Sequence, residues 1–188
     1  MTKKEKIEFT AKELFWKYGF KKVTVDEICK KSHVSRKTFY TYYKNKIDLV
    51  LSVLQQITEK AMEESYLILN GEGTFVEKLK ITMTMKSELS KSLSKEFIAD
   101  FFDVESKEIM DYYAKIMEEY MTFLSDFFRK AQETGEMNPD LNLNYVIWYL
   151  NKQKELMSSP ELIAMFPDAE TMTKQLTQSI IYGIMPVR

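Results

Sequence analysis

Apolar side chains recur along the chain at helical spacing, starting close to the N-terminus. The first stripe has an apolar residue or pair every three or four positions, so that its members share one face of a helix. Its members are Ile7, Ala11, Leu14, Phe15 and Tyr18. Gly19 follows, and glycine favours the positive φ found where helices end. The pattern predicts a first helix that ends at Gly19.

Two shorter helices are predicted next. Thr24 and Glu27 have the three-residue spacing of a capping box, which marks a helix start. The polar stretch of residues 32–35 interrupts the pattern, and Ser35 then caps a short helix over residues 36–43. The two helices and the turn between them form a helix-turn-helix that spans roughly Thr24 to Lys46.

The rest of the chain is also predicted to be helical. Asn45 is a cap for a long helix that reaches about Leu69, and residues 70–73 then break the pattern. The five further predicted helices cover about residues 75–93, 95–102, 109–135, 141–157 and 169–184. No strand alternation is present. We therefore expect an all-α fold of about nine helices, with three or four in the head and five in the body.

Charge is distributed unevenly between the two ends of the chain. Residues 1–48 contain 13 basic and six acidic side chains, a net charge of +7. Residues 49–188 contain 14 basic and 22 acidic side chains, a net charge of −8. A basic head on an acidic body favours a polyanionic partner for the head alone.

Composition makes several other classes of protein improbable. Cys29 is the one cysteine and His33 the one histidine, so a disulfide, a Cys/His metal cluster and redox chemistry are not expected. No run of about 18 uncharged apolar residues and no signal-peptide pattern is present, which favours a cytoplasmic protein without membrane contact. We expect neither a cofactor nor a metal.

The short helix over residues 36–43 has two unlike faces. Phe39 and Tyr43 share one face, whereas Lys37, Thr41 and Lys44 lie on the other. A major groove admits one helix, whose N-terminal residues meet the base edges. We expect the aromatic face to pack against the protein and the polar face to read DNA.

Each polar residue of the helix-turn-helix then has an expected role. Arg36 and Lys37 can donate hydrogen bonds to guanine O6 and N7, and Thr38 and Thr41 can contact neighbouring bases. Hydroxyl groups at helix starts and beside the reading face suit phosphates. These phosphate contacts are expected from Thr24, Ser35, Tyr40 and Tyr42. Lys46 lies in the first turn of its helix, where a cation interacts unfavourably with the helix dipole. A bound phosphate would offset that interaction, so Lys46 is also expected to contact a phosphate.

The stretch from Val34 to Leu49, VSRKTFYTYYKNKIDL, resembles the TetR family of regulators, as do the spacings of Ile7, Gly19 and Thr24. The resemblance implies a DNA-binding domain over residues 1–48. It implies a ligand-binding and dimerisation domain over residues 49–188 that dimerises through its last two helices. His33 stands where the family usually has a small residue, and we expect it at positive φ in the turn. Lys37 also stands where the family often has a small residue, and we expect this lysine to change the base preference.

The body is rich in methionine and aromatic residues, most of which must form ordinary core. Helical bundles also bind ligands between helices, and methionine adapts to irregular apolar pockets. The candidate ligand-binding residues are Met62, Tyr66, Met85, Phe101, Tyr113, Met117, Tyr120 and Trp148.

Function follows from these expectations and the resemblance. The resemblance implies a homodimer that binds a near-palindromic, double-stranded operator and releases it when a small, largely apolar effector binds. Apolar residues of the last two helices, among them Val146, Leu150 and Met172, exceed what one hairpin needs, which also favours a dimer.

Two alternatives remain open. An all-helical enzyme would need catalytic groups, but the body has no histidine, phosphate loop or nucleophile motif, so no catalytic residue is expected. An architectural protein would bind nucleic acid without sequence preference, and only a binding experiment separates it from a regulator.

Overall fold

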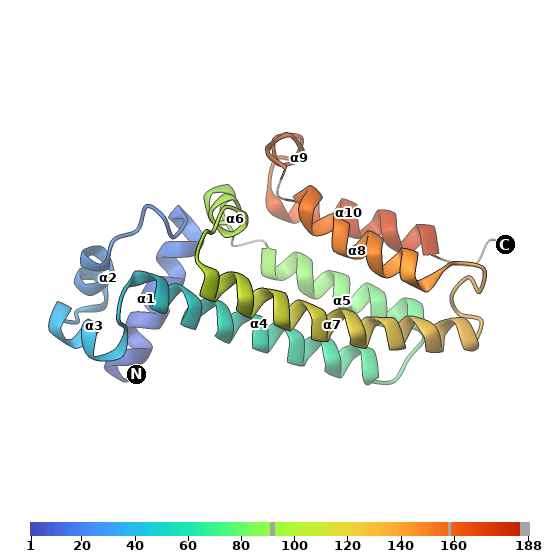
Figure 1. Ribbon diagram of the computed structural model, residues 1–188, viewed down its shortest axis with the longest axis horizontal. Coiled ribbons are helices and arrows are strands. Elements are labelled where there is room, and N and C mark those ends of the chain that lie inside the picture. The colour runs from blue at the N-terminus through green and yellow to red at the C-terminus, as the bar shows by residue number, and fades with distance from the viewer. Residues whose placement is uncertain (91–92, 158, 185–188) are drawn as a thin grey trace. The chain divides into compact units, whose positions relative to one another are not determined.

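The computed structural model describes residues 1–90, 93–157 and 159–184 of the chain, and all regular structure in these ranges is helical. Figure 1 shows the ten helices in chain order. They are α1 (Lys3–Tyr18), α2 (Val25–Ser32), α3 (Arg36–Tyr42), α4 (Lys46–Asn70), α5 (Phe75–Ser90), α6 (Lys95–Phe102), α7 (Lys107–Glu133), α8 (Leu143–Met157), α9 (Pro160–Ala164) and α10 (Ala169–Ile184). The expectation of an all-α fold is confirmed.

The count exceeds the expected nine because α9 was not anticipated. Proline commonly ends a helical pattern, and the predicted helices at 141–157 and 169–184 leave the segment with Pro160 unassigned. In the structure Ser159 caps α9 and Pro160 occupies its first turn. Proline is well tolerated there, since its missing N–H would have no partner within the helix. The same residue therefore also begins a short helix.

The chain forms two compact units. The first comprises Met1–Ala61 with Ser92–Asp111, and the second comprises Met62–Lys91 with Tyr112–Arg188. Helices α4 and α7 each begin in the first unit and continue into the second. These units record which residues pack together, so the division by function at residue 48 remains a prediction.

The core of the first unit draws on α1 to α4, α6 and the start of α7. Ile7, Phe15, Phe39 and Leu49 are almost completely buried in it. One detail of the predicted stripe is wrong, because Tyr18 is 43 % exposed while Trp16 is buried. Trp16 packs on Phe97 of α6 with ring centroids 4.5 Å apart, a contact that helical spacing alone does not reveal.

The core of the second unit is formed by α4, α5, α7, α8 and the loop that follows α7. Its buried members include Leu69, Phe75, Phe128 and Met137. Helix α10 packs against α5, and its Met172 is buried. Across the described residues, no helix is both long and apolar enough to cross a membrane.

Candidate DNA-binding site

The helix-turn-helix is built from local caps that the sequence specifies. The Thr24 hydroxyl accepts a hydrogen bond from the Glu27 N–H at 3.2 Å, and the Glu27 carboxylate accepts one from the Thr24 N–H at 2.8 Å. These bonds favour the ionised carboxylate and lower the pKa of Glu27. The predicted capping box of α2 is thus present.

The turn between α2 and α3 is closed by His33 and Ser35. His33 has φ of 54° and caps the C-terminus of α2, as expected of a residue that tolerates the left-handed region. The Ser35 side chain accepts a hydrogen bond from the Thr38 N–H at 3.1 Å and so caps α3. The caps fix where α3 begins and therefore which residues lie in its first turn.

The inner face of α3 is anchored by aromatic residues. Phe39 is fully buried and lies 5.7 Å from the ring of Tyr43, which is also buried. The Tyr43 hydroxyl donates to the Glu8 carboxylate at 2.5 Å, and Ser52 donates to the same oxygen at 3.0 Å. Burial and the bond to Glu8 raise the pKa of Tyr43. Helices α1, α3 and α4 are joined at this carboxylate.

The outer face of α3 is open to solvent. Lys37 and Thr41 are exposed, and Tyr40 and Tyr42 are 49 % and 43 % exposed. The Thr41 hydroxyl donates to the Thr38 carbonyl at 2.6 Å, an internal bond that uses its proton. This face carries four of the predicted DNA-contacting residues, namely Lys37, Tyr40, Thr41 and Tyr42.

Arg36 and Thr38 make contacts within the protein. Arg36 Nε lies 3.2 Å from the Asp26 carboxylate, although both side chains are more than half exposed. The pKa of Arg36 is raised, first by a hydrogen bond to Tyr40 and then by Asp26. Thr38 is half-buried, and its hydroxyl lies 3.0 Å from that of Ser35. Both residues border the exposed face of α3, and their roles in base contact stay predictions.

Lys46 occupies a place that the sequence does not suggest. Its ammonium group donates to the backbone carbonyls of Phe20, Lys21 and Val23 at 2.8, 2.9 and 2.9 Å. An ammonium group has three donors, and all three are used. The expected phosphate contact of Lys46 is untested, and this geometry argues against it, because its amine holds the turn between α1 and α2.

Helix α6 completes the first unit at the same turn. The Asp100 carboxylate accepts a hydrogen bond from the Lys21 N–H at 2.7 Å, and the Lys21 ammonium group pairs with Asp103. Gly19 has φ of 75° and lies against Asp100, so a Cβ at this position would collide with that side chain. Sequence reasoning missed these acidic partners because they lie about 80 positions away along the chain.

The eight candidate ligand-binding residues do not all share one environment. Met62, Tyr66, Met117 and Tyr120 belong to the core cluster of the second unit. Met85 and Tyr113 are partly buried, and burial raises the pKa of Tyr113. Phe101 packs instead in the cluster of the first unit. Trp148 is 56 % exposed and stacks on Tyr145.

A buried polar pair accompanies the first four of these residues. Ser65 is 2 % exposed, and its hydroxyl lies 2.7 Å from the hydroxyl of Tyr120. No pattern in the sequence marks Ser65, since a lone serine in a helix has no periodic partner. In the described part of the chain, no three His, Cys, Asp or Glu side chains are grouped to hold a metal ion.

Comparison with known proteins agrees with the geometry of the head. Residues 10–53 match the family model described as "Bacterial regulatory proteins, tetR family". An uncharacterized HTH-type transcriptional regulator of Bacillus subtilis, YdgC, is 22% identical over a 175-residue alignment that covers 89% of this chain and 85% of that protein.

Two solved structures show the same fold over the whole chain. The regulator FadR of Bacillus subtilis, in complex with stearoyl-CoA, has a TM-score of 0.71 and 18% identity over 96% of this chain and 98% of that one. A putative transcriptional regulator of Saccharomonospora viridis, in complex with choline, has a TM-score of 0.77 and 16% identity over 98% of each chain. The helix-turn-helix of residues 10–53 therefore matches the TetR-family model, and the chain as a whole has the fold of these solved regulators.

Proposed function

We propose that the protein is a homodimeric repressor that binds a near-palindromic operator through α3 and releases it when a small, largely apolar effector binds the second unit. The observation that carries the proposal is the two-faced α3. Phe39 is fully buried, while Lys37 and Thr41 are exposed on a short helix whose start is fixed by Ser35. This arrangement suits a helix that enters a major groove with rigid support.

The contact set follows from exposure, since the hydroxyl groups of Thr24 and Thr41 already donate hydrogen bonds within the protein. Arg36, Lys37 and Thr41 are assigned to base edges, with Thr38 beside them. Thr24, Ser35, Tyr40 and Tyr42 are assigned to phosphates. Lys46 is omitted from this set and is instead assigned to hold the turn of Phe20 to Val23 in place.

Dimerisation through α8 and α10 is supported by side chains that a single chain leaves uncovered. Tyr145 and Trp148 on α8 are 55 % and 56 % exposed, and Tyr182 on α10 is 75 % exposed. Val146 and Met172, which the sequence analysis assigned to this surface, are buried within the chain. The proposed interface therefore uses the opposite, aromatic side of α8.

The effector is assigned to the region of Met62, Tyr66, Met117 and Tyr120. The first three of these side chains are only partly buried although they lie against a core. The Ser65–Tyr120 pair supplies one polar contact in otherwise apolar surroundings. The solved relatives carry stearoyl-CoA and choline, which are unlike ligands, so the chemistry of this effector is not inferred from either.

Coupling to DNA is assigned to α6, which contacts the α1–α2 turn through Asp100 and Asp103. An effector that favours a different position of α6 would move this turn and, with it, the reading helix. Such an effector must bind the two states with different affinities.

Selection of bound sequences from a random DNA library tests the proposal. The expected product is a near-palindrome whose half-sites lie about one helical turn apart, or a multiple of that distance. An unpaired half-site, or no enriched sequence, would contradict a dimeric regulator. A compound that binds but leaves operator affinity unchanged is not the effector.

A further inference from the structure

A pocket of about 420 Å³ lies at the end of the second unit where α4 finishes and α5 begins. Its walls come from the end of α4, the first turn of α5 and the last three turns of α7. The volume falls within the roughly 300–1,000 Å³ usual for small-molecule sites. None of the eight residues proposed for the effector lines it.

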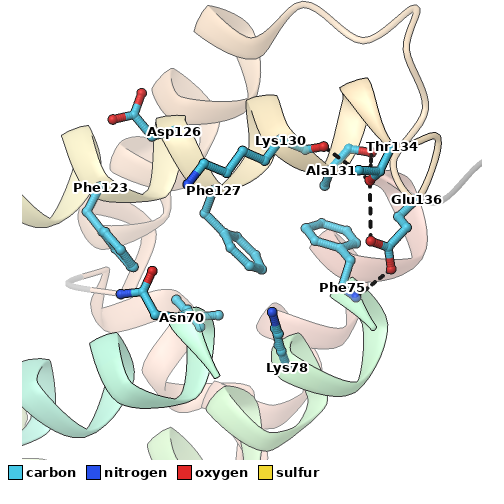
Figure 2. A pocket seen from close by; sticks show the side chains of 11 residues that line it. Asn70, Phe75, Lys78, Phe123, Asp126, Phe127, Lys130, Ala131, Thr134 and Glu136 are labelled. Carbon is cyan, nitrogen blue, oxygen red and sulfur yellow. Dashed lines mark hydrogen bonds between the residues drawn. The ribbon is translucent and has the colours of Figure 1, made fainter. Parts of the chain in front are cut away.

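The pocket has an aromatic floor. Phe75 and Phe127 stack with ring centroids 5.2 Å apart, and Phe123, whose ring packs edge-on against Tyr66 at 4.5 Å, also lines the pocket. Figure 2 shows Phe123 and Phe127 projecting from α7 toward α5 and Asn70. Phe123 and Phe127 are only partly buried, so a flat apolar group would cover exposed ring surface.

The lining carries two lysines, Lys78 and Lys130, and two carboxylates, Asp126 and Glu136, that do not pair with them. Lys78, which is half-buried, and Lys130 have no carboxylate partner in the described part of the chain. Figure 2 shows Lys78 rising from α5 into the space and Asp126 pointing away from it. Lys78 is thus a partly desolvated cation beside an apolar floor, which favours an anion, and Lys130 adds an exposed cation to the lining.

The two acidic residues of the lining are already occupied. Asp126 accepts a hydrogen bond from Arg129 at 2.7 Å. The Glu136 carboxylate accepts one from the Phe75 N–H at 2.7 Å, at the start of α5. The Thr134 hydroxyl lies 3.3 Å from the same carboxylate and 3.1 Å from the Lys130 carbonyl oxygen, and its one proton serves one of these acceptors at a time. Neither carboxylate pairs with Lys78 or Lys130.

We propose that this pocket is a second small-molecule site, next to the proposed effector site but lined by different residues, that binds amphipathic anions: a carboxylate near Lys78 and Lys130, with an aromatic or other flat apolar group on Phe75, Phe123 and Phe127. This second site does not depend on operator binding or on release of the operator by an effector. Its test therefore requires neither DNA nor the effector.

The probe is 2-naphthoate, with the neutral 2-naphthylmethanol as its matched control. Binding is followed in the full-length chain by NMR of ¹³C-labelled alanine and leucine methyl groups. Ala131 and Leu69 line the pocket, whereas Ala11 is buried in the first unit and serves as the reference. The methyl signals of Ala131 and Leu69 should shift saturably with 2-naphthoate, and that of Ala11 should not.

Two double variants separate the site from general electrostatics. Lys78→Gln with Lys130→Gln removes both proposed contacts and should weaken 2-naphthoate binding by about three- to tenfold. Lys80→Gln with Lys115→Gln removes the same charge from exposed positions of α5 and α7 outside the pocket, and its affinity should stay within about twofold of the wild type.

The proposal is overturned by any of three results. These are equal affinity for 2-naphthoate in the two double variants, equal affinity for 2-naphthylmethanol and 2-naphthoate, and shifts that appear only at methyl groups away from Ala131 and Leu69. Unchanged methyl spectra of the free variants show that they remain folded.

Discussion

The ammonium group of Lys46 lies 2.8 Å from the carbonyl oxygen of Phe20, 26 positions earlier in the chain. With its bonds to Lys21 and Val23, it satisfies three carbonyls of the turn between α1 and α2. A charge-assisted hydrogen bond is stronger than a neutral one, and a lost partner leaves partly buried carbonyls unsatisfied. Lys46 thus contributes to the head mainly as a structural residue.

Replacement of Lys46 by methionine keeps an unbranched apolar side chain that is one atom shorter and removes the donors. We expect the free energy of unfolding to fall by about 1–3 kcal/mol, as measured by urea denaturation. Because the ammonium group is assigned no phosphate, the salt dependence of DNA binding should stay close to that of the wild type. A stable variant whose salt slope falls by about one would instead identify Lys46 as a phosphate contact.

Lys37 and Arg36 are expected to set base preference. Lys37→Ala and Arg36→Ala should each reduce discrimination at one base pair per half-site by about 1–3 kcal/mol, because each removes donors to guanine. Competition between the selected operator and its single-base variants measures this loss. Lys115→Ala, an exposed lysine of α7, is the control and should leave discrimination unchanged.

Tyr43 positions α3 through the hydroxyl bond to Glu8. Tyr43→Phe keeps the buried ring, so packing on Phe39 is preserved while the bond to the carboxylate is lost. We expect the variant to be less stable by about 1–2 kcal/mol in urea denaturation and to select the same operator sequence. A changed operator preference at wild-type stability would show that Tyr43 contacts DNA.

The Glu27 carboxylate makes the start of α2 sensitive to pH. Its pKa is lowered in the folded chain by bonds to Thr24, so its stabilising contribution is present above its unfolded pKa, near the ordinary 4.5. That contribution is lost as pH falls through the lowered folded value. The unfolding free energy of Glu27→Gln should therefore fall less steeply below about pH 5 than that of the wild type. Identical slopes in the two proteins would show that the capping box does not perturb Glu27.

The exposed aromatic side of α8 and α10 is expected to form the dimer interface. Trp148→Glu places a charge in that proposed interface and should give a monomer by light scattering, with weakened operator binding. Met110→Glu is the matched control, because Met110 is 55 % exposed on α7 within the first unit. A Trp148→Glu protein that remains dimeric would place the interface elsewhere.

Local features of the head could be predicted from the sequence because they depend on neighbours three or four positions apart. The caps at Thr24 and Ser35, the positive φ of His33 and the buried Phe39 are of this kind. The positions of Lys46 and Glu8 depend on contacts between distant segments. Nothing in the sequence indicates that Lys46 binds the turn between α1 and α2 or that Glu8 accepts a hydrogen bond from the buried Tyr43.

The body was predicted less completely for a related reason. Apolar spacing identified its helices but not which side of α8 faces the core, so Val146 was assigned to the surface while Tyr145 is exposed. The pocket beside Phe127 depends on how the end of α4, the start of α5 and α7 converge. That convergence is a tertiary feature without a pattern in the sequence.

Sequence-specific binding of DNA is the central claim, and a comparison of two DNAs across salt concentrations tests it most directly. The chain's own upstream DNA should bind at least about a thousandfold more tightly than random DNA of equal length at physiological salt. Both affinities should fall as salt increases, since phosphate contacts contribute to each. Equal affinities with equal salt slopes would show a protein that binds nucleic acid without reading its sequence, which would contradict this account.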